Sequence, residues 1–225
     1  IEQGHVFDLE IHVYYEQEHA SVRIVDTHTN IVQIEKNWQV IFEDKTTSLE
    51  LKADHSALIM KQIWDFSQTV DIDDVKEILD RQIACNMAIA NEGIHNSYGA
   101  NIGHVILNMD SDCVKTRAKA YAAAGSDARM NGCELPVVIN SGSGNQGITC
   151  CVPVVVYAKE LDCTQEQLYR ALVLSNLTAI YIKTGIGTLS AFCGAVSSGA
   201  AAGAGIAYLH NGTYKEIQHT IVNAL

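Results

Sequence analysis

The strongest constraint on the fold is a change in hydrophobic period near residue 54. Before it, apolar and polar residues alternate, most clearly over residues 7–15. A period of two is typical of a strand with one buried face. Polar breaks at 16–19 and 27–30, and a turn near Lys36, separate four such runs. The pattern predicts a small antiparallel sheet domain over residues 1–54.

From residue 55 the apolar spacing becomes three and four, which is typical of amphipathic helices. A long stripe from Ile72 to Ala90 follows Asp71, which we expect to cap a helix that ends at Gly93. A second helix is predicted at 114–130, closed by Gly132.

Two capping boxes predict two more helices. Thr164 with Gln167 precedes a helix at about 165–182, and Thr213 with Glu216 precedes one from Tyr214 onward. We therefore predict an α+β fold, in which the sheet domain is followed by a mainly α-helical domain over residues 55–225.

The segment 185–209 has no charged residue and is dominated by Gly, Ala and Ser. It is long enough to span a membrane. Its hydrophobicity is weak, however, and its basic flanks are sparse, so we favour a buried helix or two half-helices. Glycine inside a helix costs about 1 kcal/mol against alanine, which close packing would offset.

Charge and cysteine content exclude several classes of protein. The net charge of −11 argues against nucleic-acid binding, which needs lysine and arginine. Seven scattered cysteines without a C-x-x-C pair indicate reduced thiols in a cytoplasmic protein, and argue against a disulfide scaffold or a zinc ribbon. The chain begins at Ile1, shows no leader and ends on an apolar pattern, so we expect a piece of a longer protein.

The strongest local signal for function is the glycine-rich stretch 140–147, NSGSGNQG, between two apolar runs. Glycines free the backbone to turn, and a helix starting there would present amide donors to a carboxylate or phosphate. Ser141, Ser143, Asn145 and Gln146 are the candidate binding side chains. An ordinary turn is the alternative. Pro153 further predicts that this helix kinks or starts later.

A second glycine-punctuated loop, 93–104, contains three candidate catalytic residues. His95, Tyr98 and His104 could supply a base, although loop histidines are commonly just solvated. Arg129 could pair with a substrate carboxylate, or it could face the dipole at a helix end.

Three motifs occur in order: SDARM at 126–130, NSGSGNQGIT at 140–149 and LSAFCGAV at 189–196. With THTN at 27–30, they resemble the family related to the serine dehydratase alpha chain, which includes the archaeal-type L-cysteine desulfidases. The resemblance covers essentially the whole chain. It implies an oxygen-sensitive [4Fe–4S] lyase that converts L-cysteine to pyruvate, ammonia and sulfide, or L-serine to pyruvate and ammonia. Cys193 matches the central cluster cysteine of that family. The alternative interpretation of Cys193 is a small buried thiol without a ligand role.

The chain departs from that family in lacking an N-terminal Gly-Cys-Thr-Glu-Pro segment and a cysteine beyond its last residue. The resemblance therefore implies that this piece alone holds no cluster and is inactive. Two alternatives stay open. One is a pyridoxal-phosphate lyase, which needs a Schiff-base lysine, yet no lysine stands in a suggestive setting. The other is a non-enzymatic ligand-binding or assembly module.

We expect a small amino-acid substrate, without choosing cysteine over serine. Neither a nucleic acid nor a membrane is expected as a partner. The apolar Gly/Ala helix and the apolar C-terminus leave surface to be covered, so a homo-oligomer is possible.

Overall fold

The chain divides into two compact units in a computed structural model that describes residues 8–25, 30–44, 55–109, 111–187 and 193–225. The units are Ile1–Asp54 and His55–Leu225, and each is described by itself. An antiparallel sheet precedes a series of helices, so the predicted α+β class is confirmed. Motif residues 27–29 and 189–192 lie outside the described residues.

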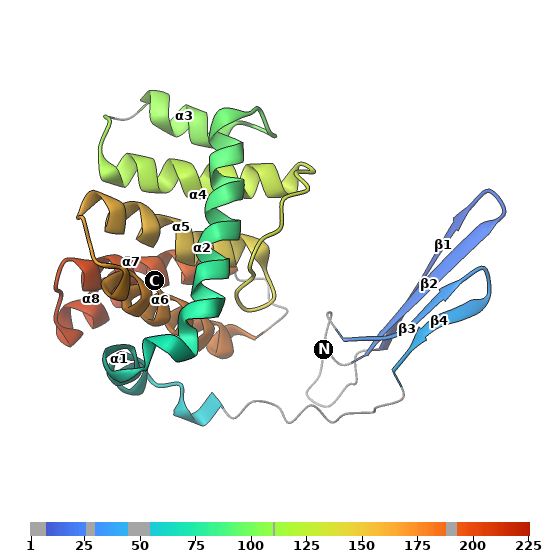
Figure 1. The fold of residues 1–225 in the computed structure, drawn as a ribbon, viewed down its shortest axis with the longest axis horizontal. Helices are drawn as coiled ribbons and strands as arrows, with labels where there is room; N and C mark the ends of the chain where they lie inside the picture. The colour runs from blue at the N-terminus through green and yellow to red at the C-terminus, as the bar shows by residue number, and fades with distance from the viewer. Residues whose placement is uncertain (1–7, 26–29, 45–54, 110, 188–192) are drawn as a thin grey trace. The chain divides into compact units, whose positions relative to one another are not determined.

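The first unit is a meander of four strands in chain order, each antiparallel to the next (Figure 1). The strands are β1 (Asp8–Tyr15), β2 (Glu18–Val25), β3 (Ile31–Lys36) and β4 (Gln39–Glu43). Asn37 and Trp38 have φ of 51° and 66° and form the tight turn between β3 and β4.

The expected half-burial of the first strand is wrong. Every residue of β1 is exposed, including the row Leu9, Ile11 and Val13. The buried side chains of the sheet are His19 and Ser21 on the opposite face, where the His19 ring stacks on Trp38 with 4.0 Å between centroids. The alternation is present, but the described residues of this unit form a single sheet layer, so none of them covers its apolar face.

The second unit is helical. A short 3-10 turn, His55–Ala57, precedes eight described helices: α1 (Met60–Thr69), α2 (Ile72–His95), α3 (Ile102–Met109), α4 (Val114–Met130), α5 (Gly144–Glu160), α6 (Gln165–Ile186), α7 (Gly194–Leu209) and α8 (Tyr214–Ala224). In Figure 1, α2 runs across α4, α5 and α6.

Helix starts follow the predicted caps. The Asp71 carboxylate accepts from the amide of Asp73 at 3.1 Å, and both capping boxes, at Thr164 and Thr213, are complete. The helix at 114–130 is confirmed, with Gly132 at φ 89° behind it. α6 runs past the predicted residue 182 to Ile186.

Two helices and one boundary were not anticipated. The patterns missed α1 and α3, and α2 continues through Gly93 to His95. Gly93 is not a terminator, because it lies where α2 crosses α4: a methyl group built on it would lie 2.1 Å from the carbonyl oxygen of Ala124. A glycine there serves close helix packing.

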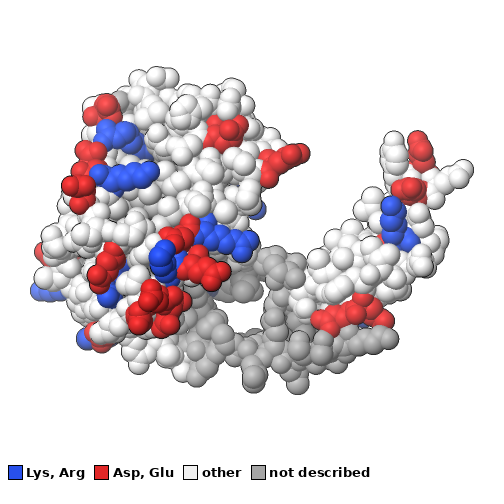
Figure 2. Space-filling model, viewed as in Figure 1, with Lys and Arg blue, Asp and Glu red and all other residues white. Residues whose placement is uncertain are grey.

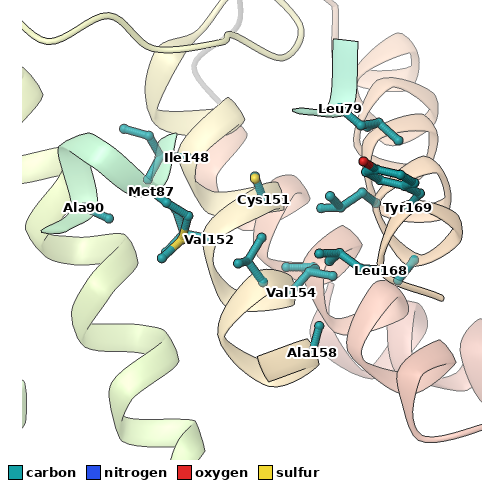
Figure 3. Packing of buried hydrophobic residues seen from close by; sticks show 14 of the residues in the cluster. Leu79, Met87, Ala90, Ile148, Cys151, Val152, Val154, Ala158, Leu168 and Tyr169 are labelled. Carbon is teal, nitrogen blue, oxygen red and sulfur yellow. The ribbon is translucent and has the colours of Figure 1, made fainter. Parts of the chain in front are cut away.

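α5 is the centre of the core. Its side chains Ile148, Val152 and Val154 are fully buried. Figure 3 shows α5 side chains lying between Met87 of α2 on one side and Leu168 of α6 on the other. Burying each such aliphatic side chain stabilises the fold by about 1.5–3 kcal/mol.

Pro153 does not delay α5, which begins well before it at Gly144. The alternative that this helix starts later is therefore wrong. Proline has no amide hydrogen, so the carbonyl of Thr149 lacks its usual helical donor at this point.

Within the Gly/Ala segment 185–209, the helix α7 covers Gly194–Leu209, whereas 185 and 186 end α6 and 188–192 lie outside the described residues. Ala201 and Ala204 are fully buried, and a methyl group on Gly205 would lie 3.0 Å from the carbonyl oxygen of Ala171 in α6. This close approach explains the small residues. None of the described helices combines the length and hydropathy that a membrane crossing requires.

Candidate active site

The glycine-rich loop forms a tight turn that starts α5. Asn140 and Ser143 exchange two backbone hydrogen bonds of 3.1 and 3.0 Å around Ser141 (φ 49°) and Gly142 (φ 79°). The Ser143 hydroxyl caps α5 by accepting from the Gln146 amide at 3.4 Å. The positive end of the α5 dipole therefore lies at the loop, which suits an anion.

Arg129 reaches this helix start from the last turn of α4. Its Nη1 donates to Oδ1 of Asn145 at 3.1 Å. Gly144 leaves room for the guanidinium, because a methyl group there would lie 2.2 Å from Nε of Arg129. Arg129 thus adds a positive charge to a helix N-terminus.

Several other cations of this unit are paired with carboxylates. Figure 2 shows blue and red side chains together on the visible face, and the pairs include Lys61–Asp65, Lys76–Asp80, Arg117–Asp112, Arg117–Glu160 and Arg170–Glu166. Among the described residues, no carboxylate pairs with Arg129. Its charge is therefore available to an external anion.

The start of α7 lies against the start of α5. Cys193 is the N-cap of α7, is exposed and makes no capping hydrogen bond with its side chain. A methyl group on the next residue, Gly194, would lie 2.1 Å from Nε2 of Gln146. The side-chain amide of Gln146 therefore lies between the N-termini of α5 and α7. Gln146 is 7 % exposed, and its Oε1 has no hydrogen-bond partner in the described chain.

Two motifs distant in sequence are thus brought together, since Gln146 of the glycine-rich loop contacts Gly194, the residue that follows Cys193. Ser141 points elsewhere: its hydroxyl donates to Oδ1 of Asn140 at 2.9 Å.

The three candidate bases lie at the end of α2, in the loop that follows it and in α3. His95 belongs to the last turn of α2, where its Nδ1 lies 2.7 Å from the carbonyl oxygen of Asn91, and His104 lies in α3. Only 96–101 form the loop expected at 93–104. No hydrogen bond of the described chain joins His95, Tyr98 or His104 to residues 140–147.

Tyr98 is already engaged. Its hydroxyl donates to Oε1 of Glu92 at 2.9 Å, and this hydrogen bond with partial burial raises the pKa of Tyr98 to about 12. A tyrosine that holds its proton this firmly is a poor base near neutral pH.

The patterns overlooked a buried amide cluster beside the loop. Gln82 and Asn176 exchange side-chain hydrogen bonds of 2.9 and 2.8 Å, and Nδ2 of Asn140 donates to Oδ1 of Asn176 at 3.0 Å. The cluster borders a cavity of about 270 Å³ with apolar walls that include Leu79 and Leu177. The sequence feature that could have indicated this cluster is Gln82, because it is a polar residue on the apolar face of α2.

The cysteines differ in chemical state. Burial raises the pKa of the Cys150 thiol to about 12 and that of Cys151 well above its ordinary value. The exposed Cys113, whose sulfur lies 3.3 Å from the Thr116 hydroxyl, has a lowered pKa because of that hydrogen bond.

We predict that iodoacetamide modifies Cys113 before Cys163, whose pKa burial raises, and that Cys150 and Cys151 react only after unfolding. The thiolate is the reactive form, and a lower pKa increases its share at neutral pH. Peptide mass spectrometry at short reaction times, with a urea-unfolded control, measures the order. Modification of Cys150 at the rate of Cys113 in the native chain would contradict this packing.

The comparison with known families is decisive. The family described as serine dehydratase alpha chain matches residues 10–225. This chain belongs to the serine dehydratase alpha chain family. The resemblance carried by the three motifs is thereby confirmed, and membership supports a lyase-type role.

Similar curated proteins come from several bacteria. A UPF0597 protein of Desulfitobacterium hafniense (strain Y51) is 54 % identical over 97 % of this chain and 51 % of its own length. Relatives of the same name in Lachnoclostridium phytofermentans and Fusobacterium nucleatum are 54 % and 39 % identical, over 91 % and 98 % of this chain and 49 % and 55 % of their own lengths. The chain thus spans about half the length of these relatives, whose names specify no substrate or cofactor. No solved structure matches it.

The serine dehydratase alpha chain family is linked in general to iron–sulfur serine dehydratases. A [4Fe–4S] cluster needs three or four thiolates. Cys193 fits one such ligand, because it is exposed beside the junction of α5 and α7. No group of three or more potential ligands exists among the described residues, however. The described chain therefore does not form a complete cluster site.

Proposed function

We propose that the full-length protein containing this chain is an amino-acid lyase that catalyses β-elimination from L-cysteine or L-serine. The observation that carries the proposal is the junction where α5 and α7 begin, with Gln146 against Gly194, Cys193 as the N-cap of α7 and Arg129 hydrogen-bonded to Asn145 of α5. Two helix N-termini and an arginine form a site for the carboxylate of an amino acid.

The proposed reaction removes the α-proton and breaks the bond from Cβ to sulfur or oxygen. Sulfide or water leaves, and the resulting enamine tautomerises and is hydrolysed to pyruvate and ammonia. The net reaction consumes one water for cysteine and none for serine. An iron–sulfur cluster bound in the full-length protein would supply a Lewis acid for the leaving group.

The residues of this chain would bind and orient the substrate. The α5 and α7 amides and Arg129 would fix the carboxylate, and the neighbouring exposed Cys193 is the residue proposed to hold iron. Fixing one end of a small substrate in this way aligns its β-substituent for departure.

The test is an anaerobic assay of the full-length protein with L-cysteine and with L-serine, following pyruvate and sulfide. We expect pyruvate from at least one substrate, a brown protein and several iron atoms per chain. An active, iron-free yellow protein would instead indicate the pyridoxal-phosphate lyase. Binding of either amino acid without turnover would favour a non-enzymatic module and overturn the proposal, whereas the yellow protein would overturn only the iron–sulfur part of it.

A further inference from the structure

A small apolar layer fixes the register of the three helices around the junction. Cys150 of α5, Ala179 of α6 and Ala201 of α7 pack together in one buried cluster. One turn farther into the bundle, a methyl group on Gly205 would lie 3.0 Å from Val154 and 3.3 Å from Ser175. α5 and α7 are therefore parallel, and α6 runs antiparallel to both.

One helical turn from that layer, toward the starts of α5 and α7, the same faces become polar. A step of four residues leads to Gln146 on α5, Lys183 on α6 and Ser197 on α7. These residues are 7 %, 7 % and 2 % exposed. Next to them Ser198 is fully buried, and its hydroxyl, like Oε1 of Gln146, has no partner in the described chain.

Lys183 is the unusual member of this polar layer. A lysine in the last turn of a helix normally extends its ammonium into water, as the exposed Lys159 does in the last turn of α5. Lys183 is buried instead, and no described residue forms a hydrogen bond or ion pair with its side chain. Its Nζ is not among the fully buried atoms of the described chain that lack a partner, so the ammonium keeps contact with solvent while no described carboxylate neutralises it.

We propose that Lys183, with Gln146, binds the α-carboxylate of the amino-acid substrate at the starts of α5 and α7. The inference rests on the proposed function and deepens it by adding a second cation, besides Arg129, to the carboxylate subsite. No described carboxylate pairs with the Lys183 ammonium or caps the two positive helix ends, and an α-carboxylate supplies one charge with two acceptor oxygens. The Ser198 hydroxyl can donate to this carboxylate, and Oε1 of Gln146, which is an acceptor, can take a hydrogen bond from the ammonium group of the same amino acid.

The test is calorimetric titration of the full-length protein with L-serine and with L-serinamide, which lacks the carboxylate charge. Lys183→Met is expected to weaken L-serine binding roughly ten- to hundredfold, because a charged hydrogen bond is lost, and to leave L-serinamide binding unchanged. Lys159→Met is the matched control and should bind both ligands as the wild type does.

A second variant keeps the test valid if Lys183→Met fails to fold. Gln146→Glu places a carboxylate in the polar layer, so it is expected to raise Tm through an ion pair with Lys183 and to abolish L-serine binding. A lowered Tm with unchanged binding would overturn the inference.

Failure of this inference and failure of the proposed function give different results. Turnover with the wild-type KM in Lys183→Met would overturn the inference alone. Carboxylate-dependent binding that requires Lys183, without turnover of cysteine or serine, would overturn the proposed lyase activity alone.

Discussion

Replacing Gly93 with alanine is expected to lower the free energy of unfolding by about 3 kcal/mol, at the upper end for overpacking. The added methyl group would lie 2.1 Å from the carbonyl oxygen of Ala124, a backbone atom that moves only if α2 and α4 separate. The higher helix propensity of alanine returns about 1 kcal/mol at most. Thermal unfolding followed by circular dichroism should show a fall in Tm of roughly 6–12 °C for a unit of this size.

Gly199→Ala is the matched control, because a methyl group there meets nothing within 4 Å. It is expected to leave stability unchanged or to raise it by up to about 1 kcal/mol through helix propensity. Equal shifts in the two variants would show that the crossing of α2 and α4 is not as close as described.

Replacing Cys193 with alanine is expected to reduce pyruvate formation by the full-length protein at least about a thousandfold, since a Lewis-acid metal contributes several kcal/mol to the transition state. Iron content should fall in parallel. Between iron-free preparations of the variant and the wild type, Tm should not differ, because the side chain is exposed and makes no capping hydrogen bond. Anaerobic kinetics with iron analysis on the same preparation measures both effects.

Cys113→Ala is the control for Cys193→Ala. Cys113 is also an exposed helix N-cap whose side chain makes no capping hydrogen bond, at the start of α4. Its replacement should preserve iron and activity. Full iron content in Cys193→Ala, or an equal loss in both variants, would exclude Cys193 as the specific iron ligand.

Local features of the fold were predictable where one residue decides the outcome. Asp71, Thr164 and Thr213 mark helix starts because a side-chain oxygen satisfies an amide that the helix leaves open, and this depends on neighbours in sequence alone. The strand β1 was predictable because the alternation of apolar and polar residues also depends only on neighbours in sequence.

Features decided by tertiary packing were not predictable in this way. Gly93 resembles a helix terminator in sequence, yet α2 continues through it because the α4 backbone fills the space beside it. The exposed apolar row of β1 shows the same limit, because alternation indicates a face that can be buried but not what covers it.

The candidate site was predictable in part. Gly142 and Ser143 carry the turn and the cap, so a helix start could be placed in that loop, and the three motifs indicated the family. The contact of Gln146 with Gly194 depends on how α5 and α7 pack. Lys183 stood in no recognisable motif, because its burial depends on the antiparallel course of α6. The roles of His95, Tyr98 and His104 remain predictions.

The most direct measurement is a crystal structure of the anaerobically prepared full-length protein with L-serine bound. We predict that the carboxylate of the amino acid lies where α5 and α7 begin, with its oxygens about 2.7–3.2 Å from first-turn amides of those helices. A carboxylate bound elsewhere, such as in the apolar cavity beside Gln82 and Asn176, would contradict the account.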